Sequence, residues 1–305
     1  SLYPGRLKGG FAMSVITVGD FDGVHLGHRA LLRSVTERAH RLSCESVVLT
    51  FDRNTKSVLQ GRTGCLSDAE ERKTLLLAEG VDRVECVSFN SEFQRLSARD
   101  FLCYLRDFYG CTDLYGGEDF RFGCGREGVL EDGAVCCDIL QHVVKLETDL
   151  VKISSSAIRD ALQDGLIERA NTWLGYAYSI SGRVCEGKHL GHTIGFPTLN
   201  LYPQEEKFLP RNGVYITRTQ IDGQVYPSMT NIGVCPTVDA GLGRSVETHL
   251  LDATGIYYGK EIRVSFLSRL RDERPFADLG TLMRQLYADR DIACEYHRKQ
   301  NSLSF

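Results

Sequence analysis

The sequence predicts two domains of different class, an α/β domain built on a parallel sheet and then a small antiparallel β-barrel with a closing helix. The first half alternates apolar strand-like runs with helical patterns, which is typical of a parallel sheet covered by helices. The second half contains short β-favouring runs separated by glycine-rich turns, which is typical of small barrels. A length of 305 residues also favours two domains over one.

The strands and helices of the first half follow one another in a regular order. A capping-box pattern at 97–100 predicts the start of one of the helices. In sheets of this class ligands bind beyond the carboxyl ends of the strands, so the loops that follow those ends are candidate sites. The expected strands are 15–18, 46–51, 81–89, 114–117 and 142–146, and helices are expected at 30–39, at 69–79 and from 97.

The second half begins near residue 178, where the helical pattern gives way to strands. Asp222-Gly223 predicts a tight hairpin, because Asp-Gly suits a type I′ turn. The boundary falls within 160–177, where no Pro/Ser/Gly tract indicates a flexible linker, and we expect domains of residues 1–173 and 174–305. The expected strands are 178–184, 214–221, 225–229, 246–251 and 262–267, and the closing helix carries an apolar stripe of Phe276, Leu279, Leu282, Met283 and Leu286.

Composition excludes several classes of protein. The net charge is −4 and there is no basic block, which argues against nucleic acid as a partner. No apolar run reaches the length of a membrane span, and residues 1–4 lack the pattern of a signal peptide, so we expect no membrane association. The 11 cysteines show no Cys-x-x-Cys and are interpreted as reduced, mostly buried thiols of a cytoplasmic protein, with Cys136-Cys137 as part of an apolar segment.

The first strand leads directly into Gly-Asp-Phe-Asp-Gly-Val-His-Leu-Gly-His at residues 19–28. A strand, a glycine-bearing turn and a helix in this order place backbone N–H groups and a positive dipole end at one point. His25 and His28 are three residues apart, so both face an anion held there and would stabilise charge on a reacting phosphate. Two alternatives remain open. The histidines are only loop residues, or they bind zinc, although no third ligand follows at a usual spacing.

A second candidate site lies in the barrel half. Gly182, Gly187, Gly191 and Gly195 let the backbone approach phosphates closely, and Lys188 would neutralise charge there. The glycines are followed by a segment in which Thr198 and Asn200 lie two residues apart on one extended face, and their oxygens suit Mg²⁺. The alternative, that these glycines only bend barrel strands, stays open on spacing alone.

Glu247 lies in the apolar strand Val246–Leu250. Alternation leaves two orientations open, and in one of them the side chain faces the interior, where a carboxylate would have the task of accepting a proton. The alternative is a glutamate on the solvent-exposed face of the strand.

Taken together, these segments resemble the prokaryotic bifunctional riboflavin kinase/FMN adenylyltransferase (FAD synthetase) family along nearly the whole chain and in the same order. Residues 153–159, Ile-Ser-Ser-Ser-Ala-Ile-Arg, are similar to the Ser-Ser-Thr-x-x-Arg motif of adenylyltransferases. The other matching segments are Gly19–His28, Gly117–Gly123, Ser181–Val184, Gly195–Asn200, Asn212–Tyr215, Asn231–Gly233, Pro236–Thr237, Glu247, Tyr258–Lys260 and Leu270–Glu273 with Phe276.

The resemblance implies a Rossmann-like nucleotidyltransferase domain and a kinase barrel. Riboflavin would be phosphorylated to FMN in the barrel, and FMN would be adenylylated to FAD in the first domain, with ATP and Mg²⁺ in both steps. It implies roles for these residues in the first domain: His25 and His28 in catalysis; Gly19, Phe21, Asp22, Gly23, Ser154, Ser155 and Arg159 in ATP binding; Asp119, Phe120 and Phe122 at the flavin. In the barrel it implies Glu247 as the base, Thr198 and Asn200 at Mg-ATP, and Arg271 and Glu273 at the flavin. Gly187, Lys188 and Gly191 join this ATP site as candidates from the glycine spacing.

The chain departs from the family pattern at several positions. Asp20 replaces an asparagine, Leu199 an alanine and Cys235 an arginine, and the loop 239–245 is short. Residues 52–55 replace a Pro-His pair that commonly follows the second strand. That segment keeps an alternative open, in which the first domain is degenerate and the protein is a monofunctional riboflavin kinase. A cytidylyl or adenylyl transferase that does not act on flavins would leave the barrel unexplained, and the sequence is silent on oligomeric state.

Overall fold

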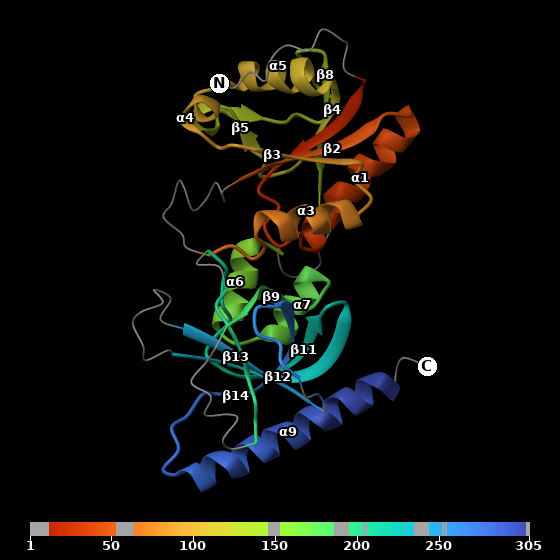
Figure 1. The fold of residues 1–305 in the computed structure, drawn as a ribbon. Helices are drawn as coiled ribbons and strands as arrows, with labels where there is room; N and C mark the ends of the chain where they lie inside the picture. The colour runs from red at the N-terminus through yellow and green to blue at the C-terminus, as the bar shows by residue number, and fades with distance from the viewer. Residues whose placement is uncertain are drawn as a thin grey trace. The chain divides into compact units, whose positions relative to one another are not determined.

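A computed structural model describes residues 12–52, 64–145, 153–185, 195–203, 206–234, 244–251, 253 and 255–302. The chain forms two compact units, Ser1–Ser155 and Ser156–Phe305, which are drawn in Figure 1 and described here one at a time. This division lies before the boundary expected at 173/174. The structural units therefore assign the helices of residues 156–174 to the barrel, whereas the functional domains 1–173 and 174–305 stay a prediction.

Unit 1 contains the parallel sheet that the sequence predicts. Its strand order is β3-β2-β1-β4-β8-β7, in which β7 alone pairs antiparallel with its neighbour. The strands are β1 (Ser14–Val18), β2 (Glu45–Phe51), β3 (Arg83–Val87), β4 (Cys111–Gly117), β7 (Val135–Cys136) and β8 (Ile139–Val144), with a separate short pair β5 (Arg121–Phe122) and β6 (Gly128–Val129). The helices are α1 (Leu26–Leu42), α3 (Ala69–Ala78), α4 (Ser91–Gln94) and α5 (Ala98–Tyr109), with a 3₁₀ turn at Cys124–Arg126.

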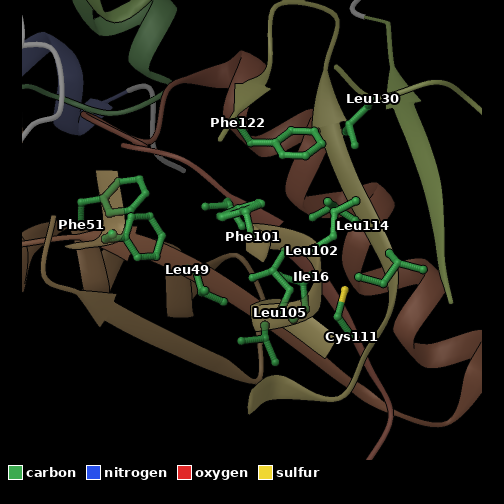
Figure 2. Packing of buried hydrophobic residues seen from close by; sticks show 14 residues of the cluster. Ile16, Leu49, Phe51, Phe101, Leu102, Leu105, Cys111, Leu114, Phe122 and Leu130 are labelled. Atoms are coloured by element: carbon green, nitrogen blue, oxygen red, sulfur yellow. The ribbon is translucent and has the colours of Figure 1, made fainter. Parts of the chain in front are cut away.

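Helices cover both faces of this sheet. Ile16 and Leu49 pack against Phe101 and Leu105 of α5, as Figure 2 shows. Their sequence neighbours point the other way, because successive side chains of a strand alternate between faces. On that second face, α1 and α3 supply most of the apolar side chains, including Leu32, Val35 and Leu76.

Unit 2 is a closed barrel of six antiparallel strands in the order β10-β13-β12-β11-β14-β9. The predicted hairpin turn is confirmed, since Asp222 and Gly223 have φ values of 48° and 83°. The strands are β9 (Ser179–Cys185), β10 (Leu199–Leu201), β11 (Gly213–Ile221), β12 (Gln224–Val234), β13 (Arg244–Leu250) and β14 (Glu261–Arg271), and the helices are α6 (Ser155–Gln163), α7 (Ile167–Leu174) and α9 (Leu279–Ser302).

Side chains of the barrel strands alternate between the interior and the outer face. Val246, Thr248 and Leu250 of β13 are buried inside it, together with hydroxyl groups that bond to one another, such as Thr230 with Thr248 at 2.9 Å. On the outer face, α9 lies along the barrel (Figure 1) and buries Ala293 against Ile216 and Met229. The closing helix is therefore confirmed. None of the helices in the described ranges is long and apolar enough to cross a membrane.

The exposure of the cysteines differs from the expectation that they are mostly buried. Among those that the structure describes, only Cys111 is buried, so the prediction of mostly buried thiols was wrong. Cys136 is exposed and Cys137 lies in the turn between β7 and β8, so this pair does not belong to an apolar segment. The physical reason for the exposure of Cys136 is that β7 is a two-residue strand at the edge of the sheet, and both of its side chains are exposed.

A fragment of residues 156–305 is expected to be more stable than one of residues 174–305, because α7 fastens the barrel wall. The Asn171 amide donates to the Phe266 carbonyl at 2.8 Å, and its carbonyl accepts from the Tyr178 N–H at 2.8 Å. These two bonds contribute ~1 kcal/mol each, and burial of the Ile167 side chain adds ~1.5–3 kcal/mol. Urea unfolding of both fragments measures the difference, and equal stabilities would refute this role of α7.

Candidate active sites

The loop after β1 forms the first candidate site, at the carboxyl edge of the sheet. Gly19 continues the strand by donating its N–H to the Leu49 carbonyl at 3.1 Å. Phe21, Gly23 and Val24 then adopt positive φ values of 48°, 79° and 38°. This turn directs the chain into α1, and two of these residues are not glycine, so the loop holds backbone strain of the kind that is common at functional sites.

His25 and His28 meet at the start of α1. His25 is the N-cap residue, and its Nδ1 accepts from the His28 N–H at 3.4 Å. Since Nδ1 accepts, the neutral ring carries its proton on Nε2, which is then a donor. The two rings stack with centroids 3.7 Å apart, and Phe21 packs edge-on against His28 at 5.1 Å. The pair thus stands at the positive end of the helix dipole, where an anion is stabilised.

Asp22 stabilises this loop through buried hydrogen bonds. It is 1 % exposed, and one carboxylate oxygen accepts from the N–H groups of Leu66 and Ser67 at 2.8 and 3.1 Å. The Ser67 hydroxyl in turn accepts from the Gly23 N–H at 2.9 Å. The Ser155 hydroxyl, far along the chain, donates to the Asp22 carbonyl at 2.9 Å. The structure thus brings Ser155 to the loop and gives Asp22 a bracing contact, which the motif alone did not indicate.

The predicted flavin residues follow β4, which pairs with β1, so both loops leave the same edge of the sheet. Asp119 is exposed, and Phe120 stacks on Phe122 with centroids 5.7 Å apart. Phe122 itself is 7 % exposed and packs against Phe101 in the core (Figure 2). Of the three predicted flavin residues, Asp119 is therefore exposed, Phe120 is half-buried and Phe122 belongs to the core.

Several predicted residues lie elsewhere. Gly187, Lys188, Gly191 and the segment 53–55 are outside the described residues, as are Cys235 and most of the loop 239–245. Ser154 precedes α6, and Arg159 lies one helical turn beyond Ser155 on α6, within unit 2.

The second candidate site is a cavity of about 300 Å³ on the outer face of the barrel. The barrel strands supply its floor, the chain around Arg271–Phe276 supplies one wall, and α9 covers it through Leu282 and Leu286. Apolar and polar side chains both line it, as expected for a site that orients a small molecule. The lining residues are Phe196, Thr198, Val214, Met229, Thr230, Asn231, Glu247, His249, Arg271, Glu273, Arg274, Phe276, Leu282 and Leu286.

Glu247 lies on the floor of this cavity. Of the two orientations left open, the barrel interior is excluded, because the neighbours Val246 and Thr248 occupy it and alternation turns Glu247 outward. In register it pairs with Asn200 of β10 on one side and Asn231 of β12 on the other. Residues directly opposite on a sheet share a face, so the carboxylate lies between two amides, and Thr198 lines the same cavity.

Arg271 and Glu273 border this cavity, and contacts within the protein position both. The Arg271 guanidinium makes a two-pronged ion pair with Asp289 of α9, with N–O distances of 2.7 and 2.9 Å. Asp289 is 2 % exposed, so this pair fastens α9 over the cavity. The Glu273 carboxylate accepts from the Asn212 side chain at 3.4 Å.

His249 was missed by the sequence reasoning. It lines the cavity, and its Nδ1 lies 2.9 Å from the Pro197 carbonyl oxygen. With the proton on Nδ1, this hydrogen bond connects β13 to the segment that contains Thr198. Its ring also packs against Phe196 at 5.0 Å. The signal was available, because His249 follows Glu247 by two residues and therefore shares its face of the strand.

The barrel unit is expected to lose stability as the pH falls below about 6.5. Burial lowers the pKa of His249 and of His297 below the usual value of 6.5. Below that pH the unfolded chain binds more protons than the folded one, so stability is full above 6.5 and decreases until the folded pKa values are passed. Thermal unfolding from pH 7.5 to about 5.5 measures this slope, and it should flatten in the double variant His249→Gln, His297→Gln. An unchanged slope in that variant would assign the pH dependence to other groups.

The fold defines a class of protein in which one chain carries a Rossmann-like unit and a closed antiparallel barrel, each with its own candidate site. Residues 11–157 match the family model described as FAD synthetase, and residues 174–297 match the one described as riboflavin kinase. The chain belongs to the family of bifunctional riboflavin kinase/FMN adenylyltransferases.

Relatives match over nearly their whole length. The bifunctional riboflavin kinase/FMN adenylyltransferase of Pseudomonas fluorescens is 37% identical, with 90% of each chain covered. That of Escherichia coli K12 is 37% identical over 92% of each chain, and that of Bacillus subtilis 33% over 93% of each. A crystal structure of a protein from Streptococcus pneumoniae, described as a macrolide-efflux protein, superposes with a TM-score of 0.84 at 31% identity, covering 92% of this chain and 94% of that one.

These comparisons confirm the family resemblance and the prediction of a bifunctional enzyme with kinase and adenylyltransferase halves. The alternative of a monofunctional riboflavin kinase is not supported, since the first half matches FAD synthetase on its own. A transferase that does not act on flavins is equally unsupported, because the barrel half matches riboflavin kinase.

Proposed function

We propose that the barrel transfers the γ-phosphoryl group of ATP to the 5′-hydroxyl of riboflavin, and that unit 1 transfers the AMP group of a second ATP to FMN, which releases pyrophosphate. The observation that carries the proposal is the position of Glu247, a carboxylate between two amides in a cavity that also contains Thr198. Such a cavity suits the 5′-hydroxyl of riboflavin, which must lose a proton as it attacks the γ-phosphate of ATP.

In the barrel, Glu247 would accept the proton of the riboflavin hydroxyl, a general-base role. Thr198 and Asn200 offer a hydroxyl and an amide oxygen, ligands that suit Mg²⁺, and they would hold the Mg-ATP phosphates together with Gly187, Lys188 and Gly191. Mg²⁺ would supply charge neutralisation at the phosphates. Arg271 and Glu273 would border the flavin, with Phe276 and Leu286 as apolar walls.

In unit 1, the stacked His25 and His28 would bind the ATP phosphates and stabilise the charge that develops as pyrophosphate leaves. Gly19, Phe21 and Gly23 would form the loop around them, with Asp22 and Ser155 as its brace. Ser154 and Arg159 would contact the triphosphate, and Asp119 and Phe120 would lie at the flavin, near the buried ring of Phe122. The assignment of these steps to residues 1–173 and 174–305 is part of the proposal.

The substrates are small molecules, namely riboflavin, FMN and ATP. A net charge of −4 and the absence of a basic block favour a protein that does not act on nucleic acid. The cysteines, interpreted as reduced thiols, favour the cytoplasm.

The decisive experiment supplies FMN, ATP and Mg²⁺ to the whole protein and measures FAD and pyrophosphate. A second reaction starts from riboflavin and measures FMN. Formation of both products is expected, and chelation of Mg²⁺ should abolish both. Phosphorylation of riboflavin without any FAD from FMN would refute the proposal for unit 1.

A further inference from the structure

Three cysteines of unit 1 gather where the turn between β7 and β8 meets α5, a region to which neither proposed reaction assigns a role. The Cys137 Sγ lies 3.7 Å from the Cys103 Sγ and 3.9 Å from the Cys136 Sγ. It also lies 3.9 Å from the Arg99 carbonyl, one helical turn before Cys103 on the same face of α5. Cys103 and Cys137 are 34 positions apart in sequence, so their contact is a product of the fold.

The turn that carries Cys137 is unusual in sequence. Cys137 and Asp138 both have positive φ values, 52° and 61°, in a two-residue hairpin turn where Asn-Gly would be favoured. Two contacts hold this turn against α5, the thiol contact and the ion pair of Asp138 with Arg106 at 3.5 Å. Strained residues persist where the surroundings fix them and often mark a functional position.

The geometry selects one pair of thiols. Adjacent residues across a trans peptide have Cα atoms about 3.8 Å apart, which is below the usual disulfide range of ~4.4–6.8 Å. A bond between Cys136 and Cys137 is therefore disfavoured. The Sγ atoms of Cys103 and Cys137 are 3.7 Å apart and must approach by about 1.7 Å to reach a bonded ~2.05 Å.

The cluster is open to a disulfide reagent of moderate size. An open cavity of about 830 Å³ is lined by all three cysteines, by Asp138 and by the cationic side chains of Arg99 and Arg106. The exposed Arg99 guanidinium suits a carboxylate of glutathione, whereas Arg106 is already ion-paired with Asp107 and Asp138. Burial and the neighbouring Cys137 thiol raise the pKa of the Cys103 thiol.

We propose that Cys137 and Cys103 form a reversible internal disulfide when the protein reacts with glutathione disulfide. The Cys137 thiolate attacks one sulfur of glutathione disulfide, forming a mixed disulfide and releasing one glutathione thiolate. The Cys103 thiolate then attacks the Cys137 sulfur and displaces the second glutathione. The two protein thiols are oxidised, glutathione disulfide is reduced to two glutathione molecules, and these carry the two protons.

Tryptic mapping without reduction tests this directly. Cys103 lies in the peptide 100–106, whereas Cys136 and Cys137 share the peptide 127–145. After treatment of the dilute full-length protein with glutathione disulfide, we expect these two peptides to be linked, with the loss of two hydrogens. Addition of dithiothreitol should separate them again, and Cys103 should resist alkylation only in the oxidised protein.

Serine variants identify the partner. Cys136→Ser should keep the link to Cys103, and Cys137→Ser should lose it. The proposal would be overturned by a link that survives in Cys137→Ser, by a bond within peptide 127–145, or by a protein that retains bound glutathione without an internal bond. Cys124 and Cys86 are exposed control thiols, and a link from Cys103 to either at equal yield would also overturn it.

Discussion

Replacement of Glu247 by glutamine is expected to reduce riboflavin phosphorylation by ~10²–10⁴-fold, the range typical for loss of a general base. Glutamine keeps the shape and a hydrogen-bonding group between Asn200 and Asn231 but accepts no proton. ATP affinity should stay close to normal, because Thr198 and Asn200 are unchanged. Adenylylation of FMN should also be unaffected, since it depends on unit 1. Steady-state rates of FMN and FAD formation measure the two effects.

Glu261 supplies a matched control for this variant. It is an exposed glutamate at the start of β14 and does not line the cavity. Glu261→Gln should leave both activities unchanged. A Glu247→Gln protein that phosphorylates riboflavin at the wild-type rate would remove Glu247 from the mechanism.

Replacement of His25 and His28 by alanine is expected to abolish FAD formation and leave FMN formation intact. Loss of a single preorganised donor at a developing charge costs ~10²–10³ in rate. Because the two rings stack at 3.7 Å and His25 Nδ1 accepts from the His28 N–H, their effects should not add. Each single variant is therefore expected to lose nearly as much adenylylation as the double variant.

A structural effect of these substitutions can be separated from a chemical one. His25 caps α1, and loss of a cap costs ~1 kcal/mol, whereas asparagine is a good N-cap. His25→Asn should keep α1 stable and still lose FAD formation. His40, exposed on the same helix, supplies the control His40→Ala. Normal adenylylation by His25→Asn would show that His25 acts only as a cap.

The order of strands and helices could be predicted from the sequence because it depends on local patterns. Alternating apolar runs located the central strands, and Ser97 proved to be the N-cap of α5, accepting from the Asp100 N–H. β10 was expected as an extended segment but not among the barrel strands, because a run of three residues carries no periodicity. The division between structural units at 155/156 could not be predicted, because α7 has only a helical pattern in sequence and its bonds from Asn171 and Glu168 to β14 are tertiary contacts.

The sequence by itself determined the two fold classes, the two candidate sites and the family. These predictions rest on short local motifs, namely the loop 19–28, the segment 195–200 and the strand that contains Glu247. Only the tertiary structure decided on which face of the barrel Glu247 lies. Alternation in the sequence assigns its side chain to one face of the strand, but which face points into the barrel depends on how the sheet closes. It also decided that Asp289 fixes Arg271, 18 positions away, and that Cys137 meets Cys103. Such contacts depend on how distant elements pack, which local propensity does not specify.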